Sequence, residues 1–323
     1  MLKKIFIVGA GQLGSRHLQS LKAVKIPLDI TVVDPSNVSL RTAQERYESI
    51  AGENHRVIYV KEIPALIYDI DIAIIPSTAD VRRQIIEKLL KSGKVKYMVM
   101  EKLLFTRKDD YFRVQELLYS QGVRAWVNCS MRTMPFYAGL QPLFKGTPFI
   151  YTVKGSNYGL ITNSIHYIDH IAYLSGESNY ELDAGLLEYP PIASKRPGFL
   201  ELNGTLAVNF ANGCRGIFTC FSEGTLPVMV EIVSPEVRVI SKEWEGKALI
   251  SKKSDNWEWT ETDSTVLYQS QMTAGVVTDV LTKGTCNLVG YDESMKEHLI
   301  LLQGLLHFLN GKGNPKKELY PFT

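Results

Sequence analysis

The segment KIFIVGAGQLG, residues 4–14, joins a short apolar run to a glycine-rich turn. Residues 4–8 have the continuous apolar character of a strand that is buried on both faces. Gly9, Gly11 and Gly14 follow with the spacing G-x-G-x-x-G, which permits a tight turn, a close approach of a pyrophosphate to the backbone, and close packing of the next helix on the strand. The amino end of that helix offers N–H groups and a partial positive charge to phosphates. The segment therefore predicts a strand–turn–helix unit that binds a dinucleotide.

Asp34 directly follows the second predicted strand and lies twenty residues after Gly14. At this spacing a carboxylate reaches the ribose hydroxyls of adenosine. A carboxylate there would repel a 2′-phosphate, so we predict NAD as the cofactor, with NADP less favoured. The glycine motif alone could mark only a tight turn, but the strand, the helix and Asp34 together favour a cofactor site.

The chain repeats this strand–helix alternation up to residue 124. Continuous apolar runs alternate with amphipathic segments, which is the pattern of parallel strands covered by crossover helices. We therefore predict an α/β fold with an amino-terminal Rossmann domain, a doubly wound parallel sheet. The predicted strands are residues 4–8, 29–33, 72–75, 97–100 and 125–127, and the predicted helices are residues 13–23, 40–49, 81–91 and 111–120.

After residue 149 apolar and polar residues alternate, with hairpin turns between the runs. The predicted strands are residues 205–210, 215–221, 228–233, 237–241 and 257–260, and the predicted helices are residues 164–174 and 293–310. This pattern predicts a carboxy-terminal α+β domain with a large, mostly antiparallel open sheet. We assign residues 1–127 to the dinucleotide-binding domain and residues 128–323 to a domain for substrate binding and oligomerisation.

Composition excludes several classes of protein. The 323 residues are 45% hydrophobic and 22% charged, which excludes collagen-like, low-complexity and disordered chains. A net charge of +2 without long runs of like charge disfavours binding to nucleic acid or to an anionic membrane. The four cysteines contain no C-x-x-C pair, so we expect free thiols in the cytoplasm. The richest apolar stretch, residues 298–309, is shorter than the ~20 residues that span a bilayer.

Glu101 and Lys102 directly follow the predicted strand 97–100. Ligands of open α/β sheets bind outside the carboxyl ends of the strands, so we expect this pair at the mouth of the crevice. A desolvated lysine beside another cation has a lowered pKa and can exchange protons near neutral pH. Lys102 is therefore a candidate to take a hydroxyl proton as a hydride leaves the same carbon. The alternative is an exposed lysine in a loop.

The segment NSIHYIDH, residues 163–170, begins the first predicted helix of the second domain. Ser164 or Asn163 is a candidate N-cap. His166 and Asp169 are three residues apart and therefore share one helix face. This spacing predicts a histidine that polarises a substrate hydroxyl while Asp169 holds its tautomer. The alternative is a half-buried histidine with satisfied hydrogen bonds.

Together these motifs resemble those of the Gfo/Idh/MocA oxidoreductases, the family of glucose-fructose oxidoreductase and inositol dehydrogenase. The resemblance covers the whole chain. The glycine motif of the family corresponds to residues 9–14, its E-K-P motif to residues 101–103, its H-x-x-D element to residues 166–169, and its N-x-R-x-x-P stretch to residues 130–135. The resemblance implies a pyranose, polyol or nucleotide-sugar substrate, proton transfer by Lys102 and His166, and a sheet face that forms a homodimer or homotetramer.

Several residues depart from the family pattern. Leu103 replaces the proline of the E-K-P motif and removes a restraint on φ. Thr162 replaces a carboxylate often found four residues before the histidine, Ser164 replaces a glycine, and Ser130 replaces the asparagine of the N-x-R-x-x-P stretch. Since threonine cannot orient an imidazolium by charge, these departures leave the acid–base role of His166 open.

Lys195 and Arg196 lie in a loop that also contains proline and glycine. Their ammonium and guanidinium groups suit a carboxylate or phosphate of the substrate, and the alternative is a solvated basic loop. This loop, residues 156–166 and residues 320–323 resemble a bacterial branch of the family that is associated with cell-surface sugars.

The leading hypothesis is an NAD-dependent dehydrogenase that moves a hydride between nicotinamide and a carbinol carbon of a sugar, polyol or nucleotide-sugar derivative. We predict catalytic roles for Lys102, His166 and Asp169, cofactor contacts for Gly9, Gly11, Gln12, Leu13, Gly14, Asp34, Pro76, Ser77 and Glu101, and substrate contacts for Asn128, Arg132, Asn163, Lys195 and Arg196.

Two alternatives remain open at this stage. One is a sensor or scaffold that binds NAD(H) without turnover, suggested by the departures at Leu103, Thr162 and Ser164. The other is a metal-dependent hydrolase, because His166 and His170 are four residues apart and could bind one metal ion. No H-E-x-x-H glutamate lies between them, so we predict no metal.

Overall fold

The computed structural model describes residues 2–65, 69–312 and 316–323. The chain folds as two compact units. Unit 1 comprises the residues up to Asn128 together with Leu267–Asp292, and unit 2 comprises Cys129–Val266 and Glu293–Thr323.

Unit 1 is built on a sheet whose described strands run in the order β17-β6-β5-β4-β1-β2-β3. Neighbours from β6 to β3 pair in parallel, and β17 pairs antiparallel with β6. The chain order reverses between β1 and β4, which is the switch point where open α/β sheets bind ligands. The predicted doubly wound sheet is confirmed. Its strands are β1 (Lys3–Val8), β2 (Leu28–Val33), β3 (Arg56–Val60), β4 (Ile70–Ile75), β5 (Val95–Met100), β6 (Arg124–Val127) and β17 (Val289–Gly290).

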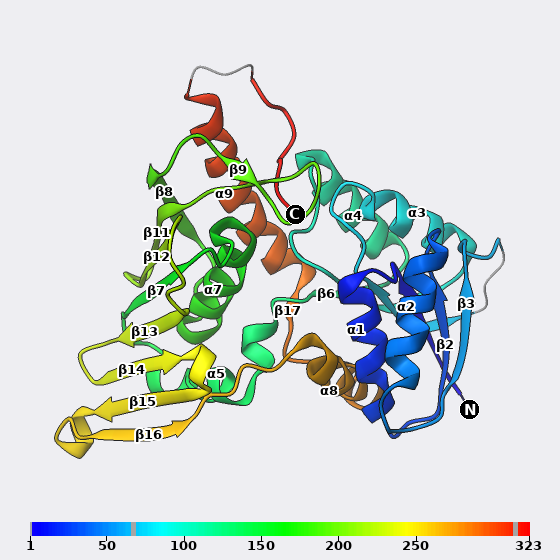
Figure 1. Cartoon of the computed structure of the whole chain (residues 1–323), viewed down its shortest axis with the longest axis horizontal. Helices are drawn as coiled ribbons and strands as arrows, with labels where there is room; N and C mark the ends of the chain where they lie inside the picture. The colour runs from blue at the N-terminus through cyan, green and yellow to red at the C-terminus, as the bar shows by residue number, and fades with distance from the viewer. Residues whose placement is uncertain (1, 66–68, 313–315) are drawn as a thin grey trace. The chain divides into compact units, whose positions relative to one another are not determined.

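Helices cover both faces of this sheet, since the crossovers run in opposite directions from the switch point. On one face a buried cluster joins alternate strand residues such as Ile5, Ile30 and Ile72 to side chains of α1, α2 and α8. Figure 1 shows α1 and α2 side by side, with α3 next to α4. The helices are α1 (Gln12–Ser20), α2 (Asn37–Glu48), α3 (Arg82–Ser92), α4 (Lys108–Ser120) and α8 (Gln269–Lys283), with a short 3-10 helix at Leu21–Ala23.

The segment Leu267–Asp292 belongs to unit 1, whereas we assigned it to the second domain from the sequence. Helix α8 packs against α1 and buries Val277 and Val280 in the cluster of unit 1, while β17 extends the sheet beside β6. An amphipathic pattern shows that a helix has an apolar face, but it does not show which of two sheets that face covers. The boundary therefore depends on tertiary packing.

Unit 2 contains a larger sheet with the order β16-β15-β14-β13-β7-β12-β11-β8. All neighbours pair antiparallel except β7 and β12, which pair in parallel. The predicted large, mostly antiparallel sheet is confirmed. Its strands are β7 (Ile150–Ser156), β8 (Tyr180–Leu187), β11 (Gly204–Phe210), β12 (Arg215–Phe221), β13 (Met229–Val233), β14 (Val237–Lys242), β15 (Lys247–Lys252) and β16 (Trp259–Asp263), and a separate hairpin pairs β9 (Ile192–Ala193) with β10 (Leu200–Glu201).

Two long helices cover one face of this sheet. A Cβ at Gly216 of β12 would lie 2.8 Å from Ile171 of α7, and a Cβ at Gly304 of α9 would lie 2.4 Å from Leu182 of β8. The glycines therefore let both helices lie close to the sheet (Figure 1). The helices are α5 (Pro135–Gly139), α6 (Gln141–Phe144), α7 (Leu160–Ser175) and α9 (Tyr291–Asn310), with 3-10 helices at Ser130–Thr133, Glu243–Glu245 and Lys253–Asp255.

The other face of the larger sheet leaves apolar side chains exposed. Ile150, Ile217, Phe221 and Val233 lie on the central strands β7, β12 and β13, and each is between 39% and 49% exposed. In β12 buried and exposed residues alternate, so one face packs on the helices while the other presents an apolar surface. The same face also carries the Lys154–Glu231 ion pair.

Candidate cofactor and substrate sites

The turn between β1 and α1 has the geometry that the glycine spacing predicts. Gly9 has φ +118°, a conformation that favours glycine, and a Cβ at Gly14 would lie 1.8 Å from the carbonyl oxygen of Gly9. A Cβ at Gly11 would meet nothing within 4 Å, so the backbone faces open space there. Gln12 and Leu13 form the first turn of α1, which has no side-chain cap and no acidic residue. Free helix N–H groups beside open backbone fit a pyrophosphate.

The Asp34 carboxylate is tied to this turn. Its Oδ2 accepts a hydrogen bond of 2.7 Å from the backbone N–H of Ala10, and its Oδ1 accepts one of 2.9 Å from that of Ser36. These bonds hold the carboxylate at the end of β2 and beside the glycine turn. The position fits the recognition of ribose hydroxyls.

Pro76 and Ser77 lie against the glycine turn at the switch point. They directly follow β4, and a Cβ at Gly9 would lie 3.1 Å from the backbone nitrogen of Ser77. A Cβ at Gly14 would lie 3.1 Å from Cγ of Pro76. The structure therefore brings the two segments together from different strands, as expected for residues that border one crevice.

Arg82 is a buried arginine that motif reasoning did not single out. Its guanidinium donates to the carbonyl oxygens of Leu103 and Leu104, at 2.5 and 2.6 Å, and to that of Ser77. Arg82 thus joins the loop after β4 to the loop that carries Lys102. No sequence motif marks it, because its role depends on two loops that meet only in the fold.

A buried polar network surrounds Glu101. The Nε2 atom of His17 lies 3.0 Å from Oε1 of Glu101, and its Nδ1 atom lies 2.8 Å from Oγ1 of Thr273. The Asn128 amide donates to Glu101 at 2.5 Å and to Oε1 of Gln269 at 2.8 Å. Gln269 and Thr273 belong to α8, so the returning helix completes the network. Asn128, predicted as a substrate contact, is therefore engaged within unit 1.

The Glu101 carboxylate is ionised despite its burial. Burial alone would raise its pKa, but the hydrogen bond and charge of His17, the Asn128 amide and the charge of Lys102 together lower the pKa of Glu101 to about 2. A buried anion therefore lies directly before Lys102 in the chain.

Lys102 is itself buried, with 9% of its surface exposed. The alternative of an exposed loop lysine is therefore wrong. The peptide bond from Lys102 to Leu103 is cis.

Helix α7 begins earlier than the sequence predicts. It starts at Leu160 with Gly159 as its N-cap, so the predicted N-cap at Ser164 or Asn163 is wrong. Ser164 lies inside the helix, where its Oγ donates to the carbonyl oxygen of Leu160 at 2.5 Å. Gly159 has φ +80° and can turn the chain into the helix. The sequence-based prediction considered only polar side chains as caps, although glycine is also a favoured N-cap residue.

Arg132 and Asp169 form a buried ion pair in unit 2. The Nη2 and Nε atoms of Arg132 lie 2.8 and 3.0 Å from the two carboxylate oxygens of Asp169, which is fully buried. Burial raises the pKa of Asp169 to about 7, and the guanidinium opposes that rise. We predicted a substrate contact for Arg132 and a tautomer-fixing role for Asp169, but the sequence did not reveal this pairing.

His170 has both ring nitrogens engaged. Its Nδ1 lies 3.1 Å from the hydroxyl of Tyr151, and its Nε2 lies 3.1 Å from the carbonyl oxygen of Tyr137. Burial lowers the pKa of His170 to about 3, so the ring is neutral. Among the residues that the structure describes, no group of three or more His, Cys, Asp or Glu side chains could hold a metal ion. The pair of His166 and His170 therefore gains no support as a metal site.

A pocket of about 370 Å³ in unit 2 brings together three of the predicted substrate residues, Asn163, Lys195 and Arg196. We refer to it as the basic pocket. It lies at the start of α7, where Thr162 also lines it. The Thr162 hydroxyl donates to Oε2 of Glu201 at 2.8 Å. Thr162 replaces a carboxylate of the family pattern, and Glu201 of β10 places another carboxylate beside it.

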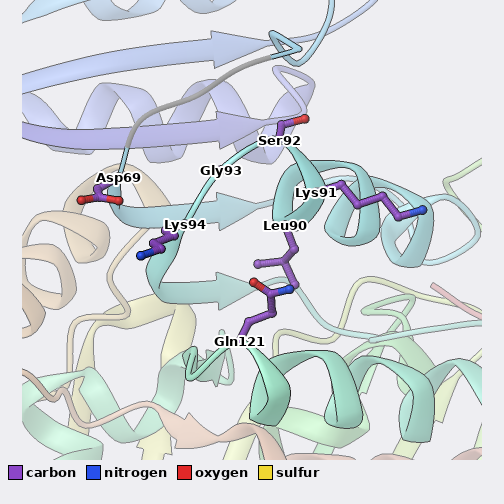
Figure 2. A pocket seen from close by; sticks show the side chains of 7 residues that line it. All are labelled: Asp69, Leu90, Lys91, Ser92, Gly93, Lys94 and Gln121. Carbon is purple, nitrogen blue, oxygen red and sulfur yellow. The ribbon is translucent and has the colours of Figure 1, made fainter.

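Another pocket lies in unit 1 (Figure 2). Asp69 and Lys94 directly precede β4 and β5, so this pocket borders the amino ends of the strands. Ligands of open α/β sheets bind at the carboxyl ends, and we assign no role to it. Its lining residues are Asp69, Leu90, Lys91, Ser92, Gly93, Lys94 and Gln121.

Comparison with known proteins agrees with the motifs. The model of the Gfo/Idh/MocA oxidoreductase family, described as an NAD-binding Rossmann fold, matches residues 3–129. A search of the curated proteins found no match to this chain.

Solved structures match nearly the whole chain at low identity. An oxidoreductase from Agrobacterium radiobacter, in complex with NAD+, L-tartaric acid and magnesium, has a TM-score of 0.74 and 15% identity over 97% of this chain and 98% of its own. A UDP-N-acetylglucosamine 3-dehydrogenase from Acidithiobacillus ferrooxidans has a TM-score of 0.67 and 12% identity over 94% and 97%. A 3-ketoreductase from Actinomadura kijaniata, solved with TDP-benzene and NADP, has a TM-score of 0.65 and 12% identity over 93% and 96%.

These matches confirm the predicted family resemblance and the predicted α/β fold, and the family description agrees with the predicted cofactor, NAD. At such identities the solved structures establish the fold alone. Among the described residues, no helix combines the length and the apolar character that a membrane span requires.

Proposed function

We propose that the chain, which resembles the Gfo/Idh/MocA oxidoreductases, transfers a hydride between NAD and a carbinol carbon of a sugar, polyol or nucleotide-sugar derivative. The observation that carries this proposal is the buried Lys102 in the same unit as the glycine turn, directly after the ionised Glu101. NAD would supply the hydride acceptor. Its pyrophosphate would be held by Gly9, Gly11, Gln12, Leu13 and Gly14, and its ribose by Asp34.

Lys102 performs the acid–base step in this proposal. Its amine takes the hydroxyl proton of the carbinol, or returns it in the reverse direction. Arg82 holds the carbonyls of the loop that follows Lys102. Pro76 and Ser77 border the cofactor from the next strand.

Unit 2 supplies the substrate contacts in this proposal. His166 binds or polarises the reacting hydroxyl. Asp169 is bound by Arg132, so we assign this pair to holding α7 rather than to contacting the substrate. Asn163, Lys195 and Arg196 bind the rest of the substrate. A sugar derivative is supported by the family resemblance and by the nucleotide-sugar substrate named for one of the structural neighbours, and we propose a role in the biosynthesis of cell-surface sugars.

Titration and turnover experiments test the proposal. Calorimetry with cofactor-stripped protein should detect NAD+ binding that is tighter than NADP+ binding, and Asp34→Ser should reduce this preference because it removes the carboxylate. When sugars, sugar acids and nucleotide sugars are then added one at a time, at least one of them should change the absorbance of the nicotinamide, which reports its oxidation or reduction. Protein that binds NADH but leaves its redox state unchanged with every compound would favour the sensor alternative instead.

We also propose that a second copy of the chain covers the outer face of the larger sheet, through Ile150, Ile217, Phe221 and Val233. The exposed apolar surface supports a homodimer or homotetramer. Light scattering coupled to size exclusion should report an oligomer, and Phe221→Glu should shift it toward monomer. A monomeric parent protein would contradict this arrangement.

The four free cysteines support a cytoplasmic location.

A further inference from the structure

The basic pocket of unit 2 has the size and lining of a small-molecule subsite. Its volume of about 370 Å³ lies within the range of roughly 300 to 1,000 Å³ that is typical of ligand pockets. Three segments far apart in the sequence form its wall: the start of α7, the loop between β9 and β10, and the end of the chain. Such convergence of polar side chains favours a binding site over a surface irregularity.

The wall contains two cations, Lys195 and Arg196. Within the described residues neither forms an ion pair, and the Nη1 atom of Arg196 donates to Oγ1 of Thr323 at 3.4 Å. Two hydrogen bonds hold the backbone of the loop that carries them: Ser194 donates its N–H to the carbonyl of Phe199 at 2.9 Å, and its Oγ accepts from the N–H of Arg196 at 3.1 Å.

The one acidic side chain in the wall is already compensated. The Glu201 carboxylate accepts hydrogen bonds from the backbone N–H groups of Ile161, Thr162 and Leu202 and from the Thr162 hydroxyl, at 2.7 to 3.2 Å. It therefore acts as a cap for the amino end of α7. It leaves the charges of Lys195 and Arg196 available to a ligand.

The remaining wall suits hydroxyl groups. Asn157, Asn163 and Asn203 contribute side-chain amides. The Nδ2 of Asn163 donates to the carbonyl oxygens of Tyr158 and Gly159, and that of Asn157 donates to the carbonyl oxygen of Gly224. The side-chain oxygens of these two amides can accept hydrogen bonds from ligand hydroxyls. Asn163 precedes His166 by three residues on α7, so both lie on one face of the helix. A ligand in the basic pocket therefore lies within one helical turn of the proposed substrate-polarising histidine.

We infer that the basic pocket binds an anionic group, a carboxylate or a phosphate, of a polyhydroxylated substrate whose reacting carbinol lies near His166. This inference rests on the proposed function for the identity of the reacting end. It adds that the substrate is acidic, and it assigns Lys195 and Arg196 to its charge and the asparagines to its hydroxyls.

Calorimetry with NAD-saturated protein tests this inference. The probes are D-glucose, which is neutral, D-glucuronate, which has a carboxylate, and D-glucose 6-phosphate. We expect at least one anionic probe to bind about tenfold or more tightly than D-glucose, because charge-assisted hydrogen bonds to two cations are added. The pocket recognises a carboxylate if D-glucuronate binds more tightly, and a phosphate if D-glucose 6-phosphate does.

Substitutions locate the binding. Lys195→Met and Arg196→Met should each weaken the preferred anion about tenfold and leave D-glucose unaffected, and Arg196→Lys should retain part of the affinity. Lys247→Met, which removes an exposed lysine from β15, is the matched control and should change nothing.

Two results would overturn the inference. In the first, the anionic probes bind no more tightly than D-glucose, or do not bind at all. In the second, Lys195→Met and Arg196→Met lose no more affinity for the anion than Lys247→Met does. The proposed function fails separately. If an anion binds in the pocket but no probe or nucleotide sugar changes the nicotinamide absorbance, the hydride transfer is refuted and the anion site remains.

Discussion

The imidazole of His17 lies 3.0 Å from the carboxylate of Glu101, and both side chains are almost completely buried. His17 comes from the helix that follows the glycine turn, and Glu101 directly precedes Lys102. The pair therefore connects the proposed cofactor cradle to the proposed acid–base group within unit 1.

Glu101→Gln should destabilise the protein in a manner that depends on pH. The pKa of Glu101 is lowered in the folded state to about 2, so its ionised form contributes stability above the unfolded pKa of roughly 4.3, and that contribution is lost as pH falls toward 2. The variant lacks this contribution, on the order of 3 kcal/mol. Urea unfolding should show a parent–variant difference that is largest at pH 7 and about half as large near pH 3. A difference that does not change with pH would contradict the ionised, buried carboxylate.

Gly11→Ala and Gly14→Ala should separate cofactor binding from folding. A Cβ at Gly11 meets no atom within 4 Å, so this variant should fold normally and bind NAD+ at least about tenfold more weakly, because the methyl group occupies the approach to the backbone. A Cβ at Gly14 would overlap the carbonyl of Gly9, and overpacking typically costs about 1–3 kcal/mol. Calorimetry and thermal unfolding of both variants check this. Normal NAD+ affinity in folded Gly11→Ala would refute the proposed cradle.

Lys102→Met should abolish turnover while nearly preserving NAD+ affinity. Removal of a general acid–base group lowers kcat by about 100-fold or more, and methionine keeps the apolar part of the buried side chain. Steady-state rates and NAD+ titrations of the same preparation provide the measurement. Lys108→Met, an exposed lysine at the start of α4, is the control for loss of charge. Substantial residual turnover in Lys102→Met would remove Lys102 from the mechanism.

Arg132→Met should destabilise unit 2, and the penalty should grow as pH rises. Without the guanidinium, the fully buried Asp169 has no compensating charge, and breaking a buried pair typically costs about 3–5 kcal/mol. Burial already raises the pKa of Asp169 to about 7. Loss of Arg132 raises it further, so the carboxyl remains protonated to higher pH and its ionisation then opposes folding.

Urea unfolding of Arg132→Met between pH 5 and 9 checks this expectation. The double variant Arg132→Met/Asp169→Asn should lose the part of the added pH dependence that is due to Asp169. The part that remains is due to Glu293 and Glu297, whose charges also act on Arg132. If Arg132→Met instead keeps the parent's stability at every pH but raises KM, Arg132 is a substrate contact rather than part of a structural pair.

Local sequence was sufficient to predict the elements whose signal lies within a few residues. Gly9, Gly11 and Gly14 predicted a turn whose geometry the structure shares, and continuous apolar runs predicted the parallel strands. It was insufficient for edge strand β3, which is mostly half-exposed and lacks a continuous buried pattern. It was also insufficient for the start of α7, where a glycine rather than a polar residue precedes the helix.

The amino-acid sequence by itself determined the fold class and the cofactor class, because strand burial and the glycine spacing are properties of neighbouring residues. Only the tertiary structure decided which distant side chains meet: His17 with Glu101, Arg132 with Asp169, and Lys195 and Arg196 with Asn163 in one pocket. It also decided that α8 returns to unit 1. The physical reason is that a buried charge or an apolar helix face needs a partner, and the chain specifies that partner through packing of the whole fold rather than through local spacing.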